Sequence, residues 1–528
     1  MGVQIILLIA SMLFFFSYFF WNRFSKTFKL NCVSPTPSIE RYDRTNYVPA
    51  KFISIFGGHL GPSFGIGPVI SSFFIAKFGS IPFLAWVVLG SCILGTFYDF
   101  AVLLLFVRNK EGSIFKIAEN YLGKTAKYIF FILFILNISL LSFVFLRFFA
   151  KTIDGDGFLI SALLFSQIFI LILGGISRFV YISQGLMFLL SAIIGAVSVF
   201  IAYKFPIHFK FDEWIWYIVL IFYGFILSFV PVSLHFQTKG YLNSVFFLLI
   251  FTLIFFGVFR HGSDDFFSSA PFFVEENLFF LPLLFVGVSC GALSGFHSIF
   301  SLVSARQVSS ECHISKIGFS SSILEGLFLI AFALIILGTI PKSLDEGFIL
   351  SVSKPFSDFF PLSDKLFLFV ILNFLLSSFE SMIRALRFIS EDFFVHDFQT
   401  KRIDLRFSLF IFLFLLIFST FYFWRHDIEE AWYFLGVIGL TISLGFFIML
   451  FQWFLKEFKN AFLLIFTFSA ILFLFLISSW IVVVLGTKYF YGHGFSFLFI
   501  PSFVAISLIY MVSKLLFGFV YEKFRRSN

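Results

Sequence analysis

Apolar stretches of about 20 residues recur along the chain, and short polar segments separate them. A helix needs ~17–25 consecutive apolar residues to cross the hydrocarbon core of a bilayer. Strands of a membrane barrel would instead alternate apolar and polar positions over ~10 residues, and these runs are continuously apolar. The pattern therefore predicts an all-α integral membrane protein with about fifteen transmembrane helices, near residues 3–21, 53–78, 80–107, 125–150, 157–176, 179–203, 214–235, 242–260, 278–303, 317–340, 364–386, 405–424, 430–454, 460–487 and 495–518.

The second predicted span contains a segment that disfavours a continuous helix. Five glycines and two prolines occur within residues 57–68, and both residue types weaken or break a helix. Secondary transporters use discontinuous helices to present backbone groups to substrates near the middle of the membrane. We therefore expect a substrate-binding segment here; the alternative is a kinked helix whose glycines pack against a neighbour. The candidate substrate-binding residues are Gly57, Gly58, His59, Gly65 and Gly67.

The ninth predicted span holds a second glycine-rich stretch, at residues 287–298. Gly287, Gly291 and Gly295 recur every four residues, so a continuous helix would place them on one face. Small residues at this spacing allow neighbouring helices to approach closely, which explains the glycines without a ligand. The polar and backbone groups that remain as candidates for contact with a substrate are those of Ser294, Gly295 and His297.

The composition and the loop charges agree with a membrane protein. The chain is 60% hydrophobic and 12% charged, with a formal net charge of +8. An excess of Lys and Arg in cytoplasmic loops accounts for that charge, so we expect no nucleic-acid partner. If the N-terminus lies outside, 26 of the 37 Lys and Arg residues fall on the cytoplasmic side. We therefore expect a multi-pass membrane protein with an external N-terminus and a cytoplasmic C-terminus.

The first apolar run, at residues 3–21, has no Lys or Arg before it, whereas a secretory signal peptide has a basic start. We therefore expect a retained first span. No polar segment exceeds about thirty residues, so we expect the function to lie within the membrane bundle rather than in a soluble domain.

Ionisable residues within apolar spans are costly and therefore indicate function. Glu380 and Arg384 lie four residues apart and can pair on one helix face, so a purely structural ion pair is the alternative for these two. Histidine changes its charge near neutral pH and suits proton coupling. The candidate ion-coupling residues are His59, Asp99, Glu325, Glu380 and Arg384, and His235 and His297 are the other ionisable residues within spans.

The chain contains no HExxH or P-loop sequence and no nucleophile elbow, in which a strand leads into a GxSxG turn, and its four cysteines lack metal-binding spacing. We therefore expect no enzyme, no cofactor and no metal site, and a secondary ion gradient as the energy source. A membrane-embedded enzyme remains an alternative, with Asp264 and Asp265 as its candidate acidic pair.

Ordered motifs in the chain resemble the carbon starvation protein A family of bacterial inner-membrane transporters. Residues 290–297, Cys-Gly-Ala-Leu-Ser-Gly-Phe-His, are nearly identical to the family's Cys-Gly-Ala-x-Ser-Gly-Phe-His. The resemblance extends over about residues 46–455. Further matches are Asn46-Tyr47-Val48-Pro49-Ala50-Lys51, Gly58-His59, Gly65-Ile66-Gly67-Pro68, Gly95 with Tyr98-Asp99-Phe100, Arg108-Asn109, Glu325, and Glu380 with Arg384 and Arg387.

The resemblance implies uptake of a small carboxylate such as pyruvate, or of short peptides, with a proton or sodium ion. It implies a core related to the amino acid–polyamine–organocation superfamily, with two inverted five-helix repeats, so that the second and seventh spans would correspond. We expect an extra helix and loop in 1–45, the transporter core in 46–404 and additional helices in 405–528.

Several of the family's polar positions are replaced in this chain. The first motif histidine is Gly58 here, and the family's Pro-Arg-Asp-Tyr is Thr-Lys-Gly-Tyr at residues 238–241. These replacements motivate a second hypothesis from another class, a sensor or interaction protein that derives from such a transporter but does not transport.

Overall fold

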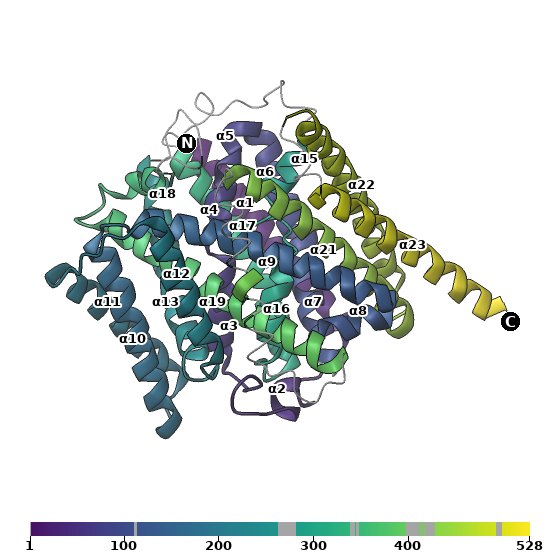
Figure 1. The fold of residues 1–528 in the computed structure, drawn as a ribbon, viewed down its shortest axis with the longest axis horizontal. Coiled ribbons are helices and arrows are strands. Elements are labelled where there is room, and N and C mark those ends of the chain that lie inside the picture. Colours follow the sequence, from purple (N-terminus) through teal and green to yellow (C-terminus); the bar gives the residue numbers. More distant parts are fainter. Residues whose placement is uncertain are drawn as a thin grey trace.

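In a computed structural model of the protein, the regular secondary structure of the described residues consists of helices alone. The structure describes residues 2–109, 113–261, 281–337, 348–397, 428–492 and 499–527, together with a few single residues between them. The helices pack side by side into one thick bundle (Figure 1), with α10 and α11 on one flank and α22 and α23 on the opposite flank. The fold class predicted from the apolar pattern, an all-α bundle with several membrane spans, is confirmed.

Eleven helices in the described residues are long and apolar enough to cross a membrane, and two shorter apolar helices accompany them. The predicted number of fifteen is not reached, because the span near 278–303 is split into two short helices and the span near 405–424 lies almost wholly outside the described residues. Asp264 and Asp265 also lie outside them. The long helices with unbroken α-helical structure are α1 (Gly2–Phe24), α9 (Lys124–Ile153), α10 (Gly157–Phe179), α11 (Gln184–Lys204), α13 (Phe236–His261), α17 (Glu311–Ile336), α19 (Ser363–Asp397), α21 (Ile428–Glu457) and α22 (Ala461–Gly492), and the shorter apolar segments are α12 (Glu213–Phe229) and part of α23 (Phe499–Ser527).

The break in the second predicted span is present, but it is much shorter than the sequence suggests. Helix α3 (Phe52–Ser63) runs through most of the glycines, and α4 (Ile66–Ser72) follows after only two residues. The expectation that the whole glycine-rich segment is irregular is therefore wrong. A Cβ atom on Gly57 would lie 1.9 Å from the carbonyl oxygen of Gly240 in α13. The glycines thus permit close packing between two helices, and packing of this kind stabilises helices in a membrane.

The ninth predicted span is a second broken helix. Helix α15 (Leu281–Gly287) ends, residues 288–296 form turns, and α16 (His297–Ala305) begins. The prediction that three glycines share one face of a continuous helix is wrong, because Gly291 adopts a φ of +92° and the helix does not continue through it. The freed carbonyl of Gly287 accepts a hydrogen bond from Nε1 of Trp432 at 2.8 Å. The two breaks therefore occur in the second and ninth predicted spans, which are not five spans apart.

Loops that the charge pattern assigns to one side of the membrane meet at one end of the bundle. Arg108, the last residue of α7 (Thr96–Arg108), donates to the carbonyl of Phe28 at 2.9 Å and pairs with Glu311 at 3.0 Å. We call this the Arg108 end; it carries α2 (Pro37–Glu40), at the bottom of Figure 1. At the other end, Lys365 pairs with Asp156 at 3.0 Å. The alternation of the loops agrees with the packing, and the assignment of the Arg108 end to the cytoplasm remains a prediction.

A covalent link ties the N-terminal segment to the Arg108 end. Cys32 and Cys312 form a disulfide, with their Cα atoms 5.2 Å apart and a sequence separation of 280. Hydrogen bonds reinforce this contact: Ser310 donates its hydroxyl to the carbonyl of Cys32 at 3.1 Å, and the backbone N–H of Asn31 donates to Glu311 at 2.9 Å. The segment after α1 is therefore fastened to the start of α17.

Candidate functional site

Four buried polar side chains from three helices meet in the interior and form what we call the His297 cluster: Asp99, His297, Ser322 and Glu325. Nδ1 of His297 lies 3.1 Å from Oδ1 of Asp99, and Nε2 lies 3.1 Å from Oε2 of Glu325. The second contact has the length of an ion pair without the alignment of a hydrogen bond. Ser322 donates its hydroxyl to Oδ2 of Asp99 at 2.6 Å. An imidazole thus lies between two carboxyl groups away from water.

Irregular backbone positions two members of the His297 cluster. A π-helical turn, η2 (Gly90–Gly95), directly precedes α7, and Asp99 lies in the first turn of α7. His297 is the first residue of α16, immediately after the turns that follow α15. Both features place a polar side chain next to a departure from regular helix, an arrangement that is frequent at functional sites.

Close packing of α17 on α7 brings the other two members into place. A Cβ atom on Gly318 would lie 2.6 Å from the Cα of Phe100, so glycine is required for this approach. Ser322 and Glu325 lie one and two turns further along α17 and therefore reach the level of Asp99. The cluster thus depends on a helix contact that one small residue makes possible.

His59, from α3, lies beside the His297 cluster without joining it directly. Its Nδ1 is 2.9 Å from the hydroxyl of Ser304. Its Nε2 is buried and has no hydrogen-bond partner among the described residues. Ser304 lies on α16, the helix that begins at His297, so this contact positions His59 against a helix of the cluster. A buried nitrogen without a partner requires an explanation, and a proton or a substrate that arrives during the working cycle would supply one.

A second buried set, the Glu380 cluster, consists of Gln167, Tyr223, His235, Lys239 and Glu380. Oε1 of Glu380 lies 2.6 Å from Nζ of Lys239 and accepts a hydrogen bond from the Tyr223 hydroxyl at 2.5 Å. Nδ1 of His235 lies 3.7 Å from Oε2, and Nε2 lies 3.2 Å from Oε1 of Gln167. Helices α10, α12, α13 and α19 each contribute to this set or border it.

The structure gives Glu380 and Arg384 different partners from those that their spacing suggests. Arg384 donates to the backbone carbonyls of Leu227 at 2.7 Å and Val230 at 3.1 Å, where α12 ends, and Glu380 pairs with Lys239. The i,i+4 pair is therefore not formed. The exposed carbonyls at a helix C-terminus carry partial negative charge and compete for the guanidinium.

Lys239 and Tyr223 are members of the site that sequence analysis missed. Lys239 is one of the 26 Lys and Arg residues that the loop pattern assigns to the cytoplasmic side, yet it lies in the first turn of α13 and is 2% exposed. The available signal was its position in residues 238–241, where the family places an arginine. Tyr223 carried no signal, because an aromatic residue in an apolar span does not stand out among so many others.

The predicted substrate-binding glycines all contact other parts of the protein. A Cβ atom on Gly58 would lie 3.2 Å from the ring of Phe236, and one on Gly67 would lie 2.8 Å from the Cβ of Cys290. Ser294 lies 3.9 Å from the sulfur of Cys290. Gly65 is packed in the same way against the hydroxyl of Ser378, and Gly295 against the carbonyl of Gly439. In this conformation, substrate access to these glycines would require the surrounding helices to separate.

The His297 cluster does not resemble a metal site, because its carboxyl groups approach opposite nitrogens of the imidazole. Within the described residues, no group of three or more His, Cys, Asp or Glu side chains is arranged to hold a metal ion.

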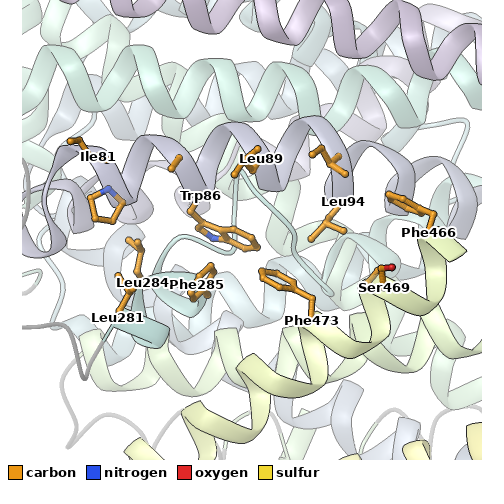
Figure 2. A pocket seen from close by; sticks show the side chains of 14 residues that line it. Ile81, Trp86, Leu89, Leu94, Leu281, Leu284, Phe285, Phe466, Ser469 and Phe473 are labelled. Carbon is orange, nitrogen blue, oxygen red and sulfur yellow. The ribbon is translucent and has the colours of Figure 1, made fainter.

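An apolar cavity of about 630 Å³ lies elsewhere, between α6 (Ser80–Leu89), α15 and α22 (Figure 2). Trp86, Phe285 and Phe473 line it, and no ionisable side chain does. Such a surface suits lipid chains rather than a hydrophilic solute, so the ionisable clusters are the better candidates for transport.

The sequence model of the family described as "Carbon starvation protein CstA" matches residues 2–356. The chain belongs to this family. The match includes all four members of the His297 cluster and the first helix, α1. It ends before Glu380.

Curated relatives and solved structures agree with a transporter fold. The chain is 26% identical to the peptide transporter CstA of Campylobacter jejuni over 60% of its own length and 47% of that protein. It is 24% identical to the pyruvate/proton symporter BtsT of Escherichia coli over 58% of its length and 44% of that protein. The chain thus spans about half the length of the curated relatives it matches. The manganese transporter of Eremococcus coleocola shares the fold at a TM-score of 0.51 and 12% identity, covering 90% of this chain and 98% of that one.

Proposed function

We propose that the chain is a secondary active transporter of a bacterial inner membrane that takes up a small carboxylate such as pyruvate, or short peptides, by proton symport. The observation that carries the proposal is the imidazole of His297 between the carboxyl groups of Asp99 and Glu325. The names of the relatives support the solute class, since one is a peptide transporter and another a pyruvate/proton symporter. They give no support to the sensor alternative.

The His297 cluster favours a proton over sodium as the coupling ion. A protonated imidazole neutralises part of the charge of two buried carboxylates, and burial without such compensation is costly. When the cluster gains or loses one proton, its net charge therefore changes by one unit at the point where α7, α16 and α17 meet. His59 lies beside this junction with a free nitrogen. We assign Asp99, Glu325 and His59 to proton coupling, and we keep Glu380 and Arg384 as a second, separate set.

The broken helices supply the proposed substrate site. Backbone N–H groups at helix N-termini attract carboxylates, because they lack intrahelical partners and lie at the positive end of the helix dipole. Helix α4 begins at Ile66, directly after Gly65, and α16 begins at His297, two residues after Gly295. We propose that the residues that bind the carboxylate once the helices separate are Gly57, Gly58, His59, Gly65, Gly67, Ser294, Gly295 and His297. We also propose a core of two inverted five-helix repeats on the basis of the family; the two breaks lie in the second and ninth predicted spans and are not the corresponding pair that such repeats require.

The test is uptake of labelled pyruvate and of a labelled dipeptide into proteoliposomes with an imposed inward proton gradient. We expect one of these solutes to accumulate and the accumulation to disappear when an ionophore collapses the gradient. Absence of uptake of both solutes would contradict the substrate assignment.

The coupling assignment has its own readout. The Asp99→Asn variant should lose gradient-driven accumulation but retain solute exchange at equal pH, because exchange needs substrate binding without net proton movement. Asp358→Asn, which changes an exposed carboxylate, serves as the control and should behave like the wild type. Unchanged accumulation in Asp99→Asn and in His59→Ala would remove the His297 cluster from the mechanism.

A further inference from the structure

A mixed polar and apolar cavity of about 210 Å³ lies at the Arg108 end, apart from both buried clusters. It is enclosed by the start of α3, the end of α10, the link between α10 and α11, and the start of α13. Lys51, Ser177, Tyr181 and Ser233 are among its lining residues, and no carboxyl group lines it. The proposed transport mechanism uses none of these side chains.

Two cations face this cavity or its rim. Nζ of Lys51 donates to the carbonyl of Ile182 at 2.8 Å and lies 4.4 Å from the centre of the Tyr181 ring. Arg178 donates to the hydroxyl of Ser233 at 3.1 Å from one terminal nitrogen and at 3.3 Å from Nε. Neither cation forms an ion pair with a carboxylate in the part of the chain that the structure describes. An ammonium can donate three hydrogen bonds and a guanidinium five, so both retain donors for a ligand.

Hydroxyl groups complete a surface suited to an anion. Tyr181, Ser233 and Tyr241 line the cavity together with Lys51. A phosphate group accepts hydrogen bonds from hydroxyls and from charged nitrogens, and it would meet both kinds of donor here. The absence of carboxyl groups from the lining removes the repulsion that would disfavour such a ligand.

The helices around the cavity carry exposed apolar side chains. Phe179 is 91% exposed and Tyr181 85% exposed where α10 ends, and Leu186, Leu189 and Ile193 on α11 are also exposed. Aromatic side chains of this kind gather at the level of lipid headgroups, and basic pockets between membrane helices bind anionic headgroups. A free phosphate ion would use the cavity but not this apolar surface.

We propose that this cavity binds the phosphate of an anionic phospholipid, held by Lys51 and Arg178, with the acyl chains along α10 and α11. The occupied site would join the loop between α10 and α11 to the start of α3, the helix that carries His59. The proposal does not depend on the transported solute, and failure of the uptake experiment would leave it intact.

The test uses the full-length protein in detergent, stripped of lipid, and native mass spectrometry with phosphatidylglycerol or phosphatidylcholine as the added lipid. We expect tighter binding of phosphatidylglycerol, and about fivefold weaker binding in Lys51→Ala and in Arg178→Ala, since one basic residue near an anionic lipid contributes about that factor. Lys204→Ala is the matched control. It removes a lysine that also lies over a tyrosine ring, 5.4 Å from the ring centre of Tyr203, at the other end of α11.

Each remaining outcome decides against the proposal. Equal binding of the two lipids, or an equal loss in Lys204→Ala, would show that no specific headgroup site exists at the cavity. Inorganic phosphate that displaces the lipid and binds with the same dependence on Lys51 and Arg178 would identify a free anion as the ligand. If Lys51→Ala does not fold, Arg178→Ala alone decides, because its exposed side chain has a hydroxyl as its hydrogen-bond partner.

Discussion

At the scale of single residues, Lys239 and Glu380 form a buried pair of opposite charges. Their charged atoms lie 2.6 Å apart, and both side chains are buried. Two paired charges in the interior compensate each other, but one alone does not, so removal of one partner is more harmful than removal of both. The tyrosine and histidine around Glu380 cannot replace its charge.

Replacement of Glu380 by glutamine should therefore destabilise the protein by ~3–5 kcal/mol, because the ammonium of Lys239 would remain buried without a counter-charge. The free energy of unfolding, measured by denaturant titration in detergent micelles, checks this. The double variant Lys239→Met with Glu380→Gln should recover most of the loss. Lys365→Met, which opens a partly exposed pair with Asp156, should cost no more than ~1 kcal/mol. Equal losses in the single and double variants would contradict the argument.

Sequence analysis identified many of the ionisable site residues but not which of them meet. Asp99, His297 and Glu325 stand out because charged or titratable groups are rare in apolar spans. Their contacts depend on long-range packing between α7, α16 and α17, which spacing along one helix does not encode. Arg384 shows the same limit, since its partners are carbonyls at the end of a different helix.

At the scale of helices, glycines determine which elements approach closely. The apolar pattern predicted the existence and type of the helices, since long apolar runs have few alternatives in a membrane. It could not predict that α3 stays helical through its glycines, because that depends on the contact with Gly240 of α13. Nor could it predict the turns after α15, which follow from the positive φ of Gly291.

The Gly57→Ala variant tests the contact between α3 and α13. The added methyl would lie 1.9 Å from a backbone oxygen, which cannot move without shifting a helix. Overpacking of this kind costs roughly 1–3 kcal/mol or more. We expect a lower yield of monodisperse protein in size-exclusion chromatography and a lower melting temperature. Gly486→Ala, in α22, is the control, since nothing lies within 4 Å of its added Cβ. A wild-type melting temperature for Gly57→Ala would show that α3 and α13 are not held together here.

At the scale of the whole molecule, the charge pattern and the packing agree on which loops share an end of the bundle. The ion pair of Arg108 with Glu311 and that of Lys365 with Asp156 lie at opposite ends, as the alternation of loops requires. The excess of Lys and Arg predicts that the Arg108 end faces the cytoplasm. Packing shows which loops share an end of the bundle, but it does not show which end faces the cytoplasm. That assignment needs separate information.

The disulfide between Cys32 and Cys312 supplies a means to obtain that information inside living cells. Disulfides persist in oxidising compartments and are rare in the reducing cytosol. If the Arg108 end faces the cytosol, both thiols should be reduced in cells and should pair only after lysis in air. Denatured samples treated with a maleimide of high mass would then show labelling at all four cysteines. Labelling at Cys92 and Cys290 alone would place this end in the oxidising periplasm and reverse the orientation of every helix. The oxidation state of this one cysteine pair in cells thus reports which side of the membrane the Arg108 end faces.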